Sequence, residues 1–388
     1  MFDNPTQVWE DVRAAGGVAH RSEIDAWVVV DYEHVRQGLR DPRLSNEVAG
    51  SGPAKGPLAP LLEVLRDQLF LMDPPRHRRL RKLVAKAFTP RSVEALEDGA
   101  RADCTALLDF DHGDFVARFA YPYPVQVIAR LFGIPAHEHA AFRDWSNDIA
   151  AFVVQYKPSR EVVGRALKAV SEIKPFLRAR VRSRQPGGDD LLAQLLAARD
   201  EGDGMHEEEI VHTAMQFLIA GHETTTNLLG NIVLALARDP ALLDAVREQP
   251  ALASAVVEET LRHDPSVQMV DRIAKEAMQI GQAQIKAGDR VMLSVAGANR
   301  DPALFENPDQ FVLDRANVKQ HLGFGFGIHV CLGAALTRLE TRLAVEQLAA
   351  TAERIEVTGA LDYRPSTTHR GLVSLPVRFA RTGTQAAP

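Results

Sequence analysis

Apolar residues recur at the spacing of amphipathic helices over much of the chain, and alternating runs are short and few. The longest helical pattern covers residues 207–238 and stops before an Asp-Pro pair. Several helices interrupted by prolines are expected over residues 93–185, and another apolar helix over residues 332–350. Strands are expected at 24–30, within 271–291 and at 372–379. The pattern therefore predicts a mainly α (α+β) fold with small β regions.

The middle of the 207–238 helix departs from ordinary helix propensity. Residues 220–226 read Ala-Gly-His-Glu-Thr-Thr-Thr, and glycine and β-branched residues weaken a helix interior. A threonine hydroxyl can also bond to the carbonyl one turn earlier and bend the helix. Such a break at the centre of a long element indicates a functional site. A polar patch on a partly exposed helix is the alternative that this stretch alone leaves open.

A glycine-rich loop surrounds Cys331 just before the 332–350 helix. Gly323, Gly325, Gly327 and Gly333 allow positive φ angles and close approach to another group. A thiolate at a helix start is favoured by the unpaired N–H groups and the helix dipole. The loop can therefore hold a soft metal or a haem iron. From the spacing alone, a packed thiol without a ligand is the competing interpretation.

Residues 73–81, Asp-Pro-Pro-Arg-His-Arg-Arg-Leu-Arg, form a basic segment. The prolines suit a helix start, and His77 and Arg81, four residues apart, share one helix face. This face can bind an anionic group or simply be solvated. The other cations of the segment are expected to face outward, either to dock an acidic partner protein or to keep the protein soluble; they are Arg76, Arg78, Arg79, Lys82 and Lys86.

Composition narrows the class of protein. The chain has 388 residues, 46% hydrophobic and 25% charged, as is typical of a globular protein. A net charge of −6 argues against nucleic-acid binding. Cys104 and Cys331 are the two cysteines, so neither a disulfide framework nor a Cys-x-x-Cys-His haem attachment is expected. The chain shows neither a signal peptide nor an apolar run of about 20 residues, which predicts a cytoplasmic protein that binds no membrane.

The motif Phe324-x-x-Gly327-x-His329-x-Cys331-x-Gly333 resembles the haem-binding signature of the cytochrome P450 family. Three further stretches resemble motifs of this family, in the same order: Asp-Pro-Pro-x-His-x-x-x-Arg at 73–81, Ala-Gly-x-Glu-Thr at 220–224 and Glu-x-x-Arg at 259–262. The resemblance covers nearly the whole chain. It implies the cytochrome P450 fold: one domain over residues 1–388 with a loose tail at about 382–388, and haem between the long central helix and the Cys-loop helix.

The resemblance also implies roles for individual residues. Cys331 is expected to be the axial ligand of the haem iron. Glu223 is expected to relay protons, and the Thr224 hydroxyl to hold dioxygen and a water in place. The residues expected in the haem pocket or at its propionates are His77, Arg81, Arg272, His329, Phe324, Gly327, Gly333, Ala220 and Gly221. A structural triad behind the Cys loop is expected from Glu259, Arg262 and Arg315. The substrate-pocket candidates are Phe70, Leu71, Gln216, Val267, Gln268, Met269 and Leu372.

The implied function is that of a haem-thiolate monooxygenase with non-covalent haem b. It would insert one oxygen atom of O₂ into a mostly apolar small molecule, by hydroxylation or epoxidation, in secondary metabolism or catabolism. Electrons would come from NAD(P)H through a reductase and a separate ferredoxin or flavodoxin. A peroxide-driven enzyme, a phenol-coupling or desaturating member of the same family, and a non-catalytic haem-thiolate sensor are the alternatives.

Overall fold

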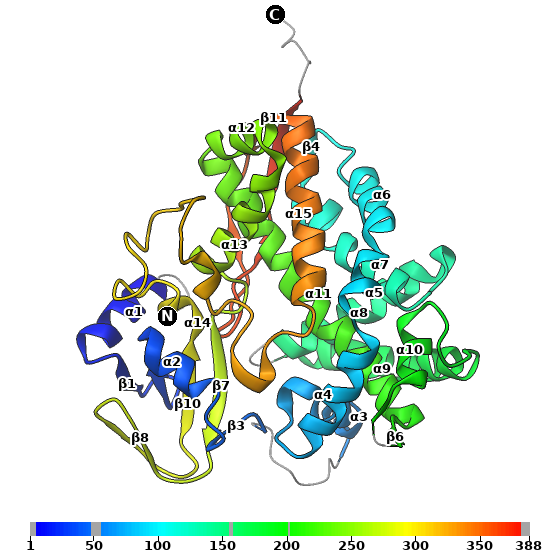
Figure 1. Ribbon diagram of the computed structural model, residues 1–388, viewed down its shortest axis with the longest axis horizontal. Coiled ribbons are helices and arrows are strands. Elements are labelled where there is room, and N and C mark those ends of the chain that lie inside the picture. Colours follow the sequence, from blue (N-terminus) through cyan, green and yellow to red (C-terminus); the bar gives the residue numbers. More distant parts are fainter. Residues whose placement is uncertain (1–4, 48–55, 155–157, 201, 382–388) are drawn as a thin grey trace, which may run out of the picture.

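The computed structural model describes residues 5–47, 56–154, 158–200 and 202–381 (Figure 1). The tail expected at 382–388 and residues 48–55 of an expected loop lie outside these ranges. Helices fill one side of the molecule, and the largest sheet lies at the N-terminal side with α1 and α2 (Figure 1). Within the described residues, no helix has both the length and the hydropathy of a membrane span.

The helices account for most of the described chain. They are α1 Pro5–Ala14, α2 Tyr32–Gly38, α3 Ala59–Arg66, α4 Arg76–Ala87, α5 Pro90–Glu94, α6 Glu97–Leu107, α7 Pro122–Leu131, α8 His139–Val154, α9 Arg160–Arg182, α10 Leu191–Ala197, α11 Glu207–Arg238, α12 Ala241–Glu248, α13 Ala253–His263, α14 Val295–Ala298 and α15 Ala334–Thr351. Short helical turns include η1 Leu69–Leu71 and η6 Gly327–His329.

The strands form small sheets. They are β1 Val18–Arg21, β2 Ala26–Val29, β3 Leu44–Ser45, β4 His112–Asp114, β5 Arg199–Asp200, β6 Asp203–Gly204, β7 Met269–Ala274, β8 Met278–Ile280, β9 Ala283–Ile285, β10 Arg290–Ser294, β11 Ala352–Val357, β12 Asp362–Tyr363, β13 Leu372–Ser374 and β14 Pro376–Arg381. The largest sheet has the order β1-β2-β10-β7-β3, with β2 and β10 parallel and the other pairs antiparallel.

The segment at 372–379, expected as one strand, forms two. β13 pairs with β12, whereas β14 pairs with β11 and β4 in another sheet. Leu375 separates them: its side chain is buried, and its N–H donates to Asp114 Oδ1 at 2.9 Å. The chain therefore changes sheets at this point, which leaves the β12–β13 hairpin free to lie elsewhere.

The central helix α11 has the bounds that the sequence predicts. Its first turn carries three acidic residues, which favour a helix N-terminus, and the Glu209 carboxylate accepts the His206 N–H at 2.9 Å. With 32 residues at a rise of about 1.5 Å each, it is about 48 Å long. Most of its residues are buried, and its buried apolar side chains belong to the main core cluster. It can therefore hold a functional group in the middle of the molecule.

The buried Glu340 on α15 supplies a stability prediction. It is 2% exposed, and burial raises the pKa of its carboxyl well above the usual value. The unfolded chain then ionises at lower pH than the folded one, so stability should fall as pH rises above about 4.5 through the raised pKa. In Glu340→Gln this part of the pH dependence should vanish, as measured by the thermal midpoint between pH 5 and 8. An unchanged slope would contradict it.

Candidate active site

Backbone hydrogen bonds shape the Cys331 loop. The Cys331 N–H donates to Phe324 O at 2.8 Å, and the Gly325 N–H donates to Leu322 O at 2.7 Å. Gly327 has a φ of +80°, and a Cβ there would lie 3.0 Å from Arg40 Cβ. Glycine is therefore required at position 327 both by conformation and by space. The turn brings Cys331 to within three residues of the start of α15.

The Cys331 thiol is accessible to solvent but largely surrounded by protein. Burial raises the pKa of Cys331, while a hydrogen bond from the Gly333 backbone and the charges of Arg81 and Arg338 oppose the rise. The thiolate therefore requires further positive charge, and a metal cation bound to sulfur supplies it. The unpaired thiol in this loop fits the expected haem iron.

A polar strip interrupts the burial of α11. Ala220, Gly221 and Thr224 are half-exposed, although the helix on either side is buried. The Thr224 hydroxyl donates to Ala220 O at 2.7 Å. One residue later, Thr225 Oγ1 lies 3.5 Å from Thr337 Oγ1 of α15. The strip therefore lies where α11 meets the helix after Cys331.

Four nitrogen-bearing side chains gather beside the Cys loop from three separate segments. The His77 and His329 rings lie 4.0 Å apart between centroids, and Arg81 Nη2 donates to Val330 O at 2.6 Å. Arg272, on β7, is 4% exposed. Its one hydrogen bond within the described ranges is from Nη1 to Asp271 O, and no described carboxylate forms an ion pair with it. Arg272 thus carries a buried positive charge without an ion pair among the described residues, while Asp73 and Asp271 lie near enough to favour that charge.

The unpaired ring nitrogens of this cluster indicate whether it could bind the haem propionates. Both ring nitrogens of His77 and Nδ1 of His329 lack a hydrogen-bond partner among the described residues. Burial lowers the pKa of His329 to about 3 and that of Arg272 to about 10. Buried polar groups normally find partners, and carboxylates would both fill these positions and favour the charged forms. The residues therefore fit a dianionic edge such as that of haem.

Replacing Arg272 tests this fit. In Arg272→Leu, haem should leave the holoprotein about tenfold faster or more, because a charge-assisted hydrogen bond to a buried carboxylate contributes about 1.5–3 kcal/mol. Transfer of haem to an excess of apomyoglobin measures the rate. Arg378→Leu, an exposed arginine on β14, is the matched control. Equal rates in the two variants would exclude the propionate role.

Behind the Cys loop, Glu259 and Arg262 form a fully buried ion pair. Arg262 Nε and Nη2 each lie 2.8 Å from the Glu259 carboxylate, and Arg315 Nε lies 3.1 Å from Glu259 Oε1. Arg262 also donates to three backbone carbonyls, those of Asn299, Pro308 and Gln310. The three residues of the expected triad are therefore in direct contact, and Arg262 holds the chain that leads into the Cys loop.

The substrate-pocket candidates occupy different environments. Phe70 is exposed, and Leu71 and Val267 are half-exposed. The side-chain oxygen of Gln216, Oε1, accepts the Leu69 N–H. Gln268 Nε2 donates to Pro265 O at 2.6 Å, and its Oε1 has no partner among the described residues.

Two further candidates are buried in the core. Met269 is 4% exposed and belongs to the cluster that contains Trp9, Val28 and Met292. Leu372 is 2% exposed and packs on α11, close to Gly230. Both side chains contribute to packing in this structure, and their contact with a substrate stays a prediction.

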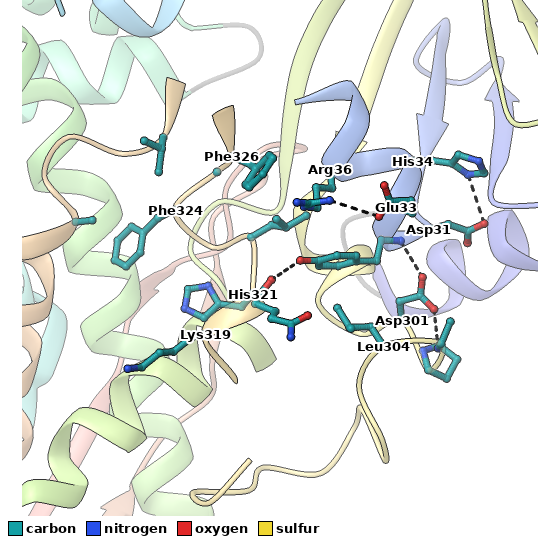
Figure 2. A pocket seen from close by; sticks show the side chains of 18 of the residues that line it. Asp31, Glu33, His34, Arg36, Asp301, Leu304, Lys319, His321, Phe324 and Phe326 are labelled. Carbon is teal, nitrogen blue, oxygen red and sulfur yellow. Dashed lines mark hydrogen bonds and ion pairs between the residues drawn. The ribbon is translucent and has the colours of Figure 1, made fainter. Parts of the chain in front are cut away.

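A groove of about 1110 Å³ lies beside the Cys loop, between α2 and the segments that contain Asp301 and Lys319. Figure 2 shows Arg36 and Phe326 together on its wall; the Arg36 guanidinium carbon lies 4.5 Å from the ring centre. Arg338 covers the Phe324 ring in the same way at 4.6 Å. Cations and exposed apolar groups thus flank the outer side of the loop.

The outward docking patch expected on α4 needs revision. Arg76 forms an ion pair with Asp67, and Arg79 pairs with both Asp203 and Glu209. These two cations are engaged within the chain because α4 packs against acidic loop residues. The cations beside the Cys loop are engaged in the same way, since Arg36 pairs with Glu33 and Arg338 pairs with Glu258. Arg78, Lys82 and Lys86 of α4 are exposed, so docking on α4 stays a prediction.

Sequence reasoning did not find Arg364. This residue follows β12, and its Nη1 lies 2.8 Å from Glu223 Oε1. No motif surrounds it, and 141 positions separate the two residues (364 − 223).

Comparison with known proteins identifies the family. The family model described as cytochrome P450 matches residues 147–350. Cytochrome P450 107B1 of Saccharopolyspora erythraea is 36% identical over 380 residues, which cover 92% of this chain and 89% of that protein. The vitamin D(3) 25-hydroxylase of Pseudonocardia autotrophica is 37% identical, with 97% and 94% coverage.

Solved structures agree. The substrate-free crystal structure of CYP109E1 from Bacillus megaterium has a TM-score of 0.89 and 32% identity, and the match covers 98% of this chain and 99% of that one. The fold expected from the sequence is therefore confirmed. Proteins of this family bind a haem with a cysteine thiolate ligand, and they use dioxygen and a redox partner. This chain belongs to the cytochrome P450 family of haem-thiolate monooxygenases.

Proposed function

We propose that this protein hydroxylates or epoxidises a mostly apolar small molecule, with Cys331 as the iron ligand of a non-covalently bound haem b. The observation that carries the proposal is the polar strip of α11, where Thr224 is half-exposed in an otherwise buried helix. The acid next to it, Glu223, is 3% exposed. A buried acid and an alcohol beside a haem site are suited to proton delivery.

The haem would be held by residues from three parts of the chain. Cys331 would bind the iron, and His77, Arg81, Arg272 and His329 would bind the propionates. When bound, the haem supplies the reductive activation of O₂. Backbone N–H groups of the Cys loop would hold the thiolate and tune its basicity.

Thr224 and Glu223 would manage protons and water. The Thr224 hydroxyl donates to Ala220 O, so its oxygen lone pairs are left to accept a hydrogen bond from a water molecule. Such a water would be held beside the half-exposed strip of α11. Glu223 would give a proton to this water and recover one from solvent. Apolar residues around the site would exclude bulk water, so that protons reach only this position.

The substrate class follows from the few polar groups of the candidate pocket. Phe70 and Leu71 offer apolar surface, and the unpaired Gln268 carbonyl offers one hydrogen-bond acceptor. Relatives that are named as an epoxidase and as hydroxylases support either outcome of oxygen insertion. We extend this to a substrate of secondary metabolism or catabolism that is mostly apolar with one polar anchor.

Electrons would come from a separate ferredoxin or flavodoxin with an NAD(P)H-dependent reductase. The groove beside the Cys loop carries Arg36, Lys319 and Arg338 together with Asp31, Glu33 and Asp301, and Val330 next to Cys331 is 41% exposed. The cations of this mixed surface would contact an acidic partner protein around the exposed Val330. A cytoplasmic location is part of the same proposal, because NAD(P)H is available there.

A substrate screen followed by turnover tests the proposal. Mostly apolar compounds should convert ferric protein from low to high spin as they displace the water on the iron, and they should then speed NADPH oxidation with a surrogate ferredoxin and reductase. The product should contain one oxygen atom more than the substrate. Product formation that needs hydrogen peroxide and ignores the redox chain would instead establish the peroxide-driven alternative.

A further inference from the structure

An ion pair joins the centre of α11 to the C-terminal hairpin. Arg364 Nη1 lies 2.8 Å from Glu223 Oε1, with side-chain exposures of 25% and 4%. The pair therefore spans the boundary between solvent and the buried middle of the helix. Glu223 is turned toward the hairpin, whereas the next residue, Thr224, bonds back to Ala220 O within the helix.

The hairpin is held on α11 by close contacts along one face of the helix. A Cβ at Gly371 would lie 1.8 Å from Asn227 Oδ1, and a Cβ at Gly230 would lie 3.8 Å from Leu372 Cδ1. Residues 223, 227 and 230 are spaced by one turn each, so they share this face. The Arg364 N–H in turn donates to Gly371 O at 2.9 Å. The backbone around Arg364 is thus fixed relative to Glu223.

Arg364 is the charged partner of the buried Glu223. Neither of its carboxylate oxygens has a geometrically good hydrogen bond among the described residues. The neighbouring imidazoles do not replace Arg364: burial lowers the pKa of His222 to about 3 and that of His369 to about 4. Tyr121 also faces the pair, and burial together with Glu223 raises the pKa of its phenol. Arg364 is therefore the cation in direct contact with Glu223.

We propose that Arg364 is a positioning residue that holds Glu223 toward the hairpin and sets when it can deliver a proton. Glu223 takes up a proton from solvent at the partly exposed Arg364. It then leaves Arg364, gives this proton to the water at Thr224, and returns to Arg364 as the carboxylate. This inference rests on the proposed role of Glu223, and it adds a residue from a distant segment to the same site.

A double-mutant cycle on the holoprotein tests the pair without turnover. Arg364→Gln should lower the thermal midpoint by about 2–4 °C, as expected for a partly exposed pair whose loss leaves a buried charge. Glu223→Gln in the Arg364→Gln background should recover most of this loss, since no charge is then left unpaired. Additive losses would overturn the pairing.

The pH profile of product formed per electron tests the positioning role. Glu223→Gln should remove one limb of this profile, and Arg364→Gln should move that limb to higher pH by about one unit, because a carboxyl without its cation favours the neutral form. Arg364→Lys should restore most of the original position. A purely structural arginine would change the yield of folded protein and leave the limb in place.

The outcomes separate this inference from the proposed function. If Glu223→Gln removes the limb and Arg364→Gln does not move it, Arg364 has no positioning role and the function of Glu223 stands. If Glu223→Gln leaves the profile unchanged, the proposed role of Glu223 fails as well. Arg378→Gln, on the exposed face of β14, should leave both measurements unchanged.

Discussion

Replacing Arg262 with methionine should lower the free energy of unfolding by about 3–5 kcal/mol, because it leaves Glu259 buried without its closest cation. Both residues are fully buried. Arg262 also satisfies three backbone carbonyls that precede the Cys loop, and each would lose a charged donor. We expect weaker haem retention in the same variant, since these carbonyls belong to the chain that leads to Cys331. Denaturant unfolding followed by tryptophan fluorescence and by haem absorbance measures both effects.

The control for this variant is Arg101→Met. Arg101 pairs with Glu97 and Glu346 at the surface, where its side chain is 48% exposed, and such pairs contribute about 1 kcal/mol or less. Similar losses in the free energy of unfolding of the two variants would show that the buried pair contributes no more to stability than a surface pair. Arg315 still touches Glu259 in the Arg262 variant, so the double change of Arg262 and Arg315 should cost more than either one.

Replacing Thr224 with alanine should lower the product formed per electron about tenfold or more while NADPH oxidation continues. Proton delivery by positioned groups contributes about 10²–10⁴-fold to a reaction step, and the variant loses the hydroxyl that fixes the delivered water. Reduced oxygen should then leave as hydrogen peroxide. The ratio of product to NADPH, measured together with peroxide, reports this directly.

Thr226→Ala is the matched control for Thr224→Ala. The Thr226 hydroxyl donates to Ala120 O at 3.0 Å and is buried, so its loss affects packing on the same helix but not the polar strip. Coupling should stay close to that of the unaltered protein. If Thr224→Ala also keeps its coupling, the hydroxyl does not position the water, and the role proposed for Thr224 is wrong.

The sequence predicts the elements that are governed by local rules. The sequence predicts the 207–238 helix because its apolar spacing, its acidic first turn and its terminal Asp-Pro pair each indicate a helix over these residues. The Cys331 loop was visible because its glycines are required by positive φ angles at Gly325 and Gly327. In both cases the neighbours in sequence determine the backbone.

Long-range contacts decide what the sequence did not predict. The segment at 372–379 divides into two strands because each half finds a different partner strand. Pro376 marks the break locally, but the sequence does not reveal which strand each half pairs with. Met269 is in the core because α1 covers β7, which alternation alone cannot reveal. Arg364 meets Glu223 only because the hairpin lies on α11. Contacts between distant segments therefore complete the site.

The absorption spectrum of the reduced protein with carbon monoxide tests the central claim, that Cys331 binds the haem iron through its sulfur. The unaltered protein should show the long-wavelength band typical of thiolate-bound haem, and Cys331→Ser should lose it, whereas Cys104→Ser, at a buried cysteine on α6, should keep it. A spectrum typical of imidazole-bound haem in the unaltered protein, or an unchanged band in Cys331→Ser, would contradict the account.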